Sequence, residues 1–178
     1  MTMLKSRTLC LTAAVAAFAG GVVAWASPSQ VGPPRPGIAA PHASLAIIVN
    51  TQNPVDGLSL DDLRRMLLGE VTRWPDGRRI TIAMRDAGQP ERDAVLRLVC
   101  RMNDQDFTRY LLQATFRGEL QSAPKVLDTP TGVRRFVFNV PGAIGYVRGD
   151  EVDRSVKVLK ITGAVPDDPA FGLTLQAK

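Results

Sequence analysis

Short, mostly apolar runs, the first of them uninterrupted, alternate with segments of helical spacing from Leu45 onward. Apolar runs of this kind are typical of strands that are buried on both faces of a parallel sheet. They cover residues 45–49, 80–84 and 143–147, with a further run at 156–161. The alternation predicts one α/β domain with a mostly parallel sheet flanked by helices, in which the first three runs form parallel strands.

Three capping residues and one proline mark four helix starts between these runs. Ser59 suits the cap of a first helix, and Pro90 suits the first position of a second helix that continues to about Met102. Asn103 and Thr129 are expected to begin a third and a fourth helix.

The N-terminal part has a different pattern. Two basic residues, an apolar run and then Ala24-Trp25-Ala26 match the order of a signal peptide and its cleavage site. We therefore expect 1–26 to be a signal peptide, 27–44 a Pro-rich linker and 45–178 the folded domain of an exported, periplasmic protein. The alternative is an uncleaved segment that anchors the protein in the inner membrane, since the apolar run is close to the minimum length of a span.

The residue types that most enzymes need are scarce in the predicted domain. His42 is the only histidine, and it lies in the linker, so neither a Ser–His nor a Cys–His nucleophile is available beyond it. Zinc sites of the usual His/Cys kind are excluded as well. Cys100 lies in an apolar helical pattern, which favours a buried, inert thiol over a reactive one. We expect no enzyme activity, no metal and no cofactor.

Charge gives little support to nucleic-acid binding. The chain has 22 basic and 17 acidic residues, a net charge of +5. The basic residues are spread among acids and form no recognisable binding motif, so we expect no nucleic-acid partner.

Four segments, in order, carry a resemblance to a known family. They are Ile48-Val49-Asn50 with Asn53-Pro54; Leu58 to Leu63 followed by Leu68 to Trp74; Ile82-Ala83-Met84-Arg85; and Val140-Pro141-Gly142-Ala143-Ile144-Gly145-Tyr146-Val147. Together they resemble the second lobe of the phosphate-binding proteins of bacterial phosphate ABC transporters, and especially the short, single-lobe relatives of that family. The resemblance implies one lobe of a type II periplasmic-binding-protein-like fold. Nothing upstream of Leu45 is expected to supply the other lobe.

The phosphate loop departs from the pattern that the resemblance implies. In that pattern an Arg is followed by Ser-Gly-Thr at a helix start, where hydroxyls and amides hold phosphate. Arg85 is present, but Gln89, Pro90 and Glu91 replace the three. Pro90 has no N–H to donate, and Glu91 adds a negative charge to the first helical turn. We expect phosphate binding to be weak or lost.

Ligands of open α/β sheets bind beyond the carboxyl ends of the strands. That rule makes six residues candidates for contact with a small oxyanion: Thr51, Asn53, Arg85, Gln89, Arg92 and Thr129. Thr129 also suits a helix cap, and Arg92 is placed to neutralise Glu91. Trp74 and Tyr146 can line a cleft, although packing beside the strand ends is the simpler interpretation.

Two functions fit this pattern. The first is a solute-binding-like module that recognises a small oxyanion weakly or together with a partner lobe. The second is an adaptor that uses the lobe to dock on an envelope or membrane protein.

The leader yields a direct test. N-terminal sequencing of the exported protein should begin at Ser27, because cleavage follows the small residue at position 26. Recovery of the full-length chain only after detergent extraction would show that the segment is an anchor.

Overall fold

The computed structural model describes residues 44–120, 122–166, 168 and 172–175. These residues lie in one compact unit, Ile38–Lys178. The predicted signal peptide and residues 27–43 of the predicted linker lie outside the described residues. Within the described part, no helix combines the length and the apolar character that crossing a membrane requires.

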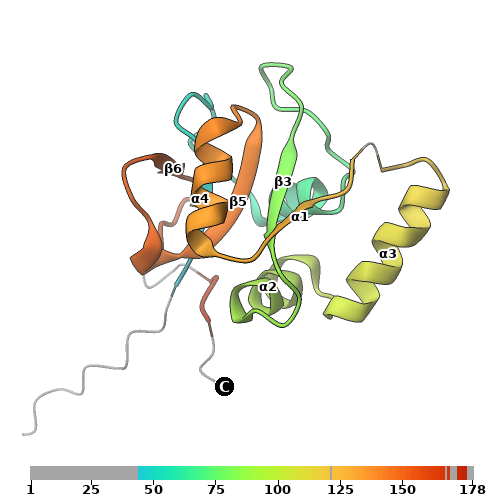
Figure 1. Ribbon diagram of the computed structural model, residues 1–178. Coiled ribbons are helices and arrows are strands. Elements are labelled where there is room, and N and C mark those ends of the chain that lie inside the picture. Colours follow the sequence, from blue (N-terminus) through green and yellow to red (C-terminus); the bar gives the residue numbers. More distant parts are fainter. Residues whose placement is uncertain (1–43, 121, 167, 169–171, 176–178) are drawn as a thin grey trace, which may run out of the picture. The chain divides into compact units, whose positions relative to one another are not determined.

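A five-stranded sheet forms the centre of the domain, in the order β4-β3-β5-β1-β6 (Figure 1). The strands are β1 (Leu45–Asn50), β3 (Thr81–Arg85), β4 (Lys125–Leu127), β5 (Ala143–Arg148) and β6 (Val156–Val158). β3 pairs in parallel with both β4 and β5. A second, two-stranded sheet joins β2 (Gly57–Leu58) to β7 (Lys160–Ile161). The predicted α/β fold with a mostly parallel sheet is confirmed.

The direction of β1 was predicted wrongly. β1 runs antiparallel to both β5 and β6, with Leu45 opposite Arg148 and Val49 opposite Ile144. The error has a physical cause, because all six residues of β1 are buried, and an uninterrupted apolar run records that burial but not the direction of the strand. As a consequence, the chain leaves β1 at the sheet edge where β3 and β5 begin.

The helices begin where the capping residues predicted. Ser59 caps α1 (Leu60–Leu67), Asn103 caps α3 (Asp104–Phe116) and Thr129 caps α4 (Pro130–Asn139). α2 (Pro90–Val95) continues as a π-helix, η1 (Leu96–Cys100), which pattern analysis did not predict. A short 3₁₀ helix, η2 (Gly149–Glu151), follows β5.

Helices cover both faces of the sheet. Alternate residues of β1 point to opposite sides: Leu45, Ile47 and Val49 join the larger core with α1 and η1, whereas Ala46 and Ile48 join the smaller core beneath α4. α4 approaches closely because β5 has Gly145 at the contact, where a Cβ atom would lie 2.9 Å from Val133 Cγ1. α3 stands at the side of the domain (Figure 1) and buries only Phe107 and Ala114.

Gly142 provides a test of the packing between the strand ends. An added Cβ atom would lie 2.1 Å from the Arg79 carbonyl oxygen, so Gly142→Ala must push two backbone segments apart. We expect a loss of about 1–3 kcal/mol in the free energy of unfolding, measured with urea. Gly172→Ala is the control, since no described residue lies within 4 Å of its added Cβ atom. Equal stability of the two variants would contradict the packing described here.

Candidate functional site

The six candidate residues lie at the two opposite edges of the sheet that the strand ends form. Arg85 ends β3 and Leu127 ends the parallel β4, so the residues that follow them share one edge. Gln89, Arg92 and Thr129 belong to the helices that start there. Thr51 and Asn53 lie at the other edge because β1 is antiparallel to β5. The expectation that all six meet at the carboxyl ends of the strands fails for these two residues.

Asn53 has a role in the local turn. Its side chain is buried and accepts a hydrogen bond from the Val55 backbone N–H at 2.9 Å. Its carbonyl oxygen accepts a hydrogen bond from Lys157 Nζ. Thr51 is exposed beside it. These contacts stabilise the turn after β1. Both oxygen atoms of Asn53 already accept a hydrogen bond within the protein.

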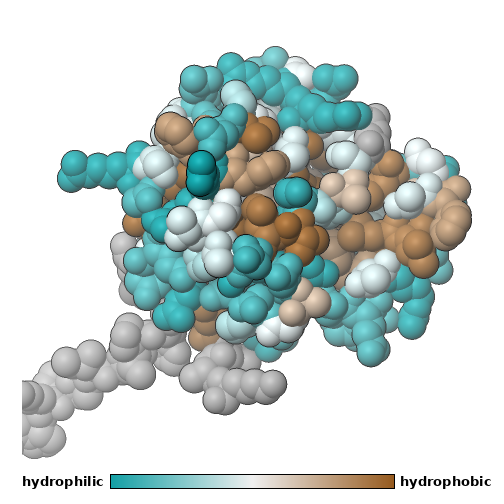
Figure 2. Space-filling model, in the orientation of Figure 1, coloured by the Kyte–Doolittle hydropathy of each residue, from teal (hydrophilic) through white to brown (hydrophobic). Residues whose placement is uncertain are grey.

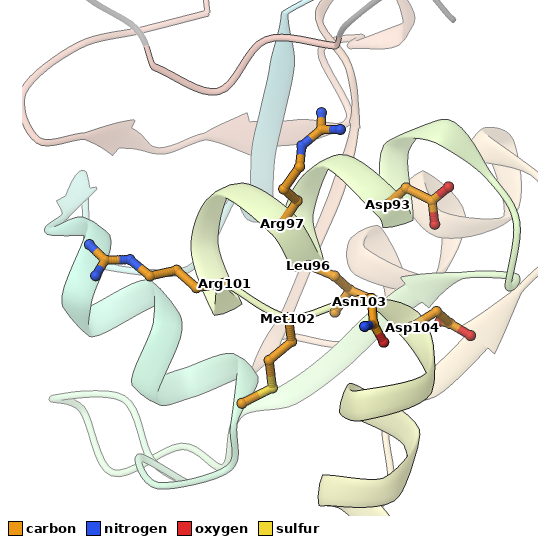
Figure 3. A pocket seen from close by; sticks show the side chains of 7 residues that line it. All are labelled: Asp93, Leu96, Arg97, Arg101, Met102, Asn103 and Asp104. Carbon is orange, nitrogen blue, oxygen red and sulfur yellow. The ribbon is translucent and has the colours of Figure 1, made fainter.

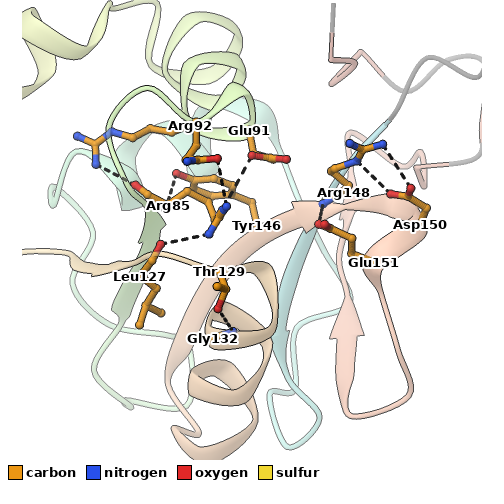
Figure 4. A network of polar contacts seen from close by, with 11 residues as sticks. Arg85, Glu91, Arg92, Leu127, Thr129, Gly132, Tyr146, Arg148, Asp150 and Glu151 are labelled. Carbon is orange, nitrogen blue, oxygen red and sulfur yellow. Dashed lines mark hydrogen bonds and ion pairs between the residues drawn. The ribbon is translucent and has the colours of Figure 1, made fainter. Parts of the chain in front are cut away.

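Arg85 is buried at the centre of the other edge, with 5% of its surface exposed (Figure 4). Its guanidinium donates to the Leu127 carbonyl at 3.4 Å and to Gln89 Oε1 at 3.3 Å. Its backbone N–H donates to the Tyr146 hydroxyl at 3.1 Å. A buried guanidinium requires partners of this kind because removing a charge from water is costly.

The anion beside Arg85 is the protein's own Glu91. Glu91 Oε2 lies 3.9 Å from Arg85 Nε, and each side chain is only 6% exposed. Within the described residues, neither of these two atoms has a hydrogen-bond partner. The pair therefore neutralises charge at the helix start without satisfying all of its polar atoms.

Arg92 does not neutralise Glu91 as expected. Arg92 Nε donates to Asp104 Oδ1 at 2.6 Å, and Nη1 donates to the Arg85 carbonyl at 3.0 Å. Its guanidinium carbon also lies 6.0 Å from the centre of the Phe107 ring. Adjacent residues of a helix point in different directions, so Arg92 faces α3 while Glu91 faces Arg85. Asp104, which sequence analysis did not single out, completes this second ion pair.

Thr129, Trp74 and Tyr146 have structural roles. Thr129 Oγ1 accepts a hydrogen bond from the Gly132 N–H at 3.0 Å, which confirms the helix cap. Trp74 is 2% exposed, and its Nε1 donates to the Gly142 carbonyl at 3.0 Å. Tyr146 is 1% exposed, and burial raises its pKa. The interpretation of both aromatic residues as packing residues is confirmed.

Cys100 is buried, as its pattern predicted. Burial raises the pKa of its thiol to about 11, although nearby Arg64 opposes the shift. The thiol is therefore protonated at neutral pH and unsuited to nucleophilic attack. The described residues include no group of three or more His, Cys, Asp or Glu side chains that could hold a metal ion.

No protein-family model matches the chain. Solved structures share its fold. An ABC-type phosphate transport receptor from Vibrio cholerae matches with a TM-score of 0.57 at 23% identity, over 70% of this chain and 48% of the receptor. A Clostridium perfringens protein crystallised with bound phosphate matches with a TM-score of 0.58 at 24% identity, over 70% of this chain and 47% of that protein. The chain thus spans about half the length of these proteins, and the predicted fold resemblance to them is confirmed.

Replacing Glu91 tests the buried ion pair. Glu91→Gln keeps the shape of the side chain but leaves the Arg85 guanidinium without its counter-charge. We expect a loss of about 3 kcal/mol in the free energy of unfolding, measured with urea at pH 7.

Glu119→Gln is the matched control. Glu119 pairs with Arg117 at 2.9 Å, but the two side chains are 57% and 53% exposed. We expect this exposed pair to contribute less than about 1 kcal/mol to the free energy of unfolding. If the Glu91 variant is no less stable than the Glu119 variant, the buried ion pair does not contribute to the stability of the fold.

Proposed function

We propose that this chain is an exported, non-enzymatic solute-binding-like lobe in which Glu91 acts as a built-in anion, so that phosphate binds weakly or not at all. The single observation that supports this proposal is the buried contact of Glu91 with Arg85. The export rests on the leader pattern of residues 1–26.

Electrostatics opposes a phosphate at this edge. Two unit charges of the same sign about 4 Å apart repel by roughly 4 kcal/mol in a partly buried setting, and phosphate carries up to two negative charges. Pro90 offers no N–H at the first helical position, and the Arg85 guanidinium already donates to Leu127 and Gln89. A phosphate would need to displace Glu91 before it could reach the guanidinium.

A second candidate function is an adaptor that docks on an envelope or membrane protein. Exposed apolar side chains favour it: Phe116 is 84% exposed and Leu112 56% exposed on α3, and Val126 is 48% exposed on the edge strand β4. Figure 2 shows apolar surface both over α3 and near the middle of the same face. Exposed aromatic and aliphatic clusters are common at protein interfaces.

Calorimetric titration tests the proposed loss of phosphate binding. The natural protein should bind phosphate with a Kd above about 1 mM, which corresponds to about −4.1 kcal/mol at most. Saturable micromolar binding would overturn the proposal and favour a phosphate receptor.

A series of variants tests whether these three residues cause the weak phosphate binding. Replacing Gln89, Pro90 and Glu91 together with Ser, Gly and Thr removes the carboxylate and restores donors, so it should tighten phosphate binding by at least about tenfold. Adding Arg85→Ala to that variant should abolish the gain, because the cation is then lost. Circular dichroism of each variant controls for unfolding.

A further inference from the structure

The first turn of α2 depends on contacts outside the helix. α2 has six residues, Pro90 is at its first position, and the Gln89 side chain makes no cap hydrogen bond. Gln89 Oε1 instead accepts from the Arg85 guanidinium. A helix this short is marginal by itself, so packing against other elements must fix the direction in which Glu91 points.

The contact that α2 positions is the one between Glu91 and Arg85. Glu91 Oε2 lies 3.9 Å from Arg85 Nε, which is too long for a hydrogen bond, and neither atom has a hydrogen-bond partner among the described residues. No bond between the two side chains therefore fixes the carboxylate. Its position is set by where the backbone of α2 places residue 91.

Arg92 ties that backbone to two other elements. Its Nη1 donates to the Arg85 carbonyl oxygen at 3.0 Å, and its Nε donates to Asp104 Oδ1 at 2.6 Å. The guanidinium carbon lies 6.0 Å from the centre of the Phe107 ring. Hydrogen bonds between ionised groups are among the stronger ones in proteins. One side chain thus joins the end of β3 and the start of α3 to the residue that directly follows Glu91.

Asp104 is the accessible half of the Arg92–Asp104 pair. Its side chain is 32% exposed, whereas that of Arg92 is 9% exposed. Asp104 also lines a cavity of about 580 Å³ between the end of the α2–η1 helix and the start of α3 (Figure 3). The chain turns there through residues 101–103, with Arg101 in the left-handed conformation, φ 58°. Because open space rather than packed side chains lies on this side of Asp104, removal of its carboxylate leaves no buried void.

We propose that Arg92 and Asp104 are positioning residues that hold Glu91 against Arg85 and thereby keep the affinity for a small oxyanion low. This role deepens the solute-binding-like function proposed above and rests on it. When the Arg92–Asp104 bond is broken, the first turn of α2 moves and the Glu91 carboxylate regains water, because burial of a charge with an imperfect partner is costly. The Arg85 guanidinium then lacks its counter-charge, and a tetrahedral oxyanion such as inorganic phosphate supplies one.

Calorimetric titration with inorganic phosphate tests this role on the full chain. Asp104→Ala removes the acceptor of the Arg92 Nε–H, so we expect phosphate binding at least about tenfold tighter than in the natural protein. Asp104→Asn removes the same negative charge but keeps an oxygen that accepts this hydrogen bond, so its gain should stay below about threefold. An equal gain in the two variants would trace the effect to the lost charge and overturn the positioning role.

Asp106→Ala is the matched control. Asp106 belongs to the same first turn of α3, but its partner is the exposed Arg109, with 3.3 Å between Oδ1 and Nη1. The change removes one negative charge and leaves the Arg92–Asp104 bond in place, so phosphate binding should not change. A tenfold gain in this variant as well would contradict a specific role of Asp104.

Arg92→Gln tests the other half of the pair with the opposite change in charge. The glutamine side chain lacks the Nε donor to Asp104, and the loss of a positive charge by itself weakens anion binding. We nevertheless expect phosphate binding about tenfold tighter, because Glu91 is no longer held in place. This variant also decides the question if circular dichroism shows that Asp104→Ala does not fold. Natural phosphate affinity in the folded variants would refute the proposal.

A double variant shows whether Asp104 acts through Glu91. Glu91→Gln should itself tighten phosphate binding because the competing carboxylate is gone, and adding Asp104→Ala should then give no further gain. A full additional gain would mean that Asp104 acts independently of Glu91, against the proposal. Micromolar phosphate binding by the natural protein would sink the proposed loss of phosphate recognition. A gain in Glu91→Gln without one in Asp104→Ala would sink the positioning role alone.

Discussion

A guanidinium that leaves water at the end of a strand must be neutralised and hydrogen-bonded by the groups around it. The Arg85 guanidinium imposes this requirement on β4, which supplies the Leu127 carbonyl, and on the start of α2, which supplies Gln89 and Glu91. The Arg85 backbone adds two further links, because its N–H donates to the Tyr146 hydroxyl of β5 and its carbonyl accepts from Arg92, which pairs with Asp104 of α3. The arrangement of the helices at this edge therefore depends on the contacts of one buried residue.

The same arrangement is the basis of the proposed loss of phosphate binding. The proteins of known structure that share the fold include a phosphate transport receptor and a protein crystallised with phosphate. In this chain the strand β3 ends in Arg85, and the Glu91 carboxylate lies beside it. Because fold alone does not establish function, the chemistry of this edge decides between a phosphate receptor and a lobe with another role.

Much of the fold could be predicted from local patterns. The caps Ser59, Asn103 and Thr129 act through hydrogen bonds to residues three positions away, and such contacts are visible in the sequence. Strand direction is different, because β1 is buried on both faces whichever way it runs. That single error placed Thr51 and Asn53 at the wrong edge. The π-helix and the left-handed Arg101 were also missed, since no local pattern distinguishes them from an ordinary helix end.

The sequence by itself determined that Pro90 and Glu91 follow Arg85 where the resemblance implies a phosphate loop, and that the predicted domain has no histidine. Both conclusions need only residue identity and order. The tertiary structure decided which charges meet: Glu91 pairs with Arg85 and Arg92 with Asp104, because β3, α2 and α3 converge at one edge and bury these side chains together. Pairing energies depend on distance and burial, and only the packing of elements far apart in the chain sets those two quantities.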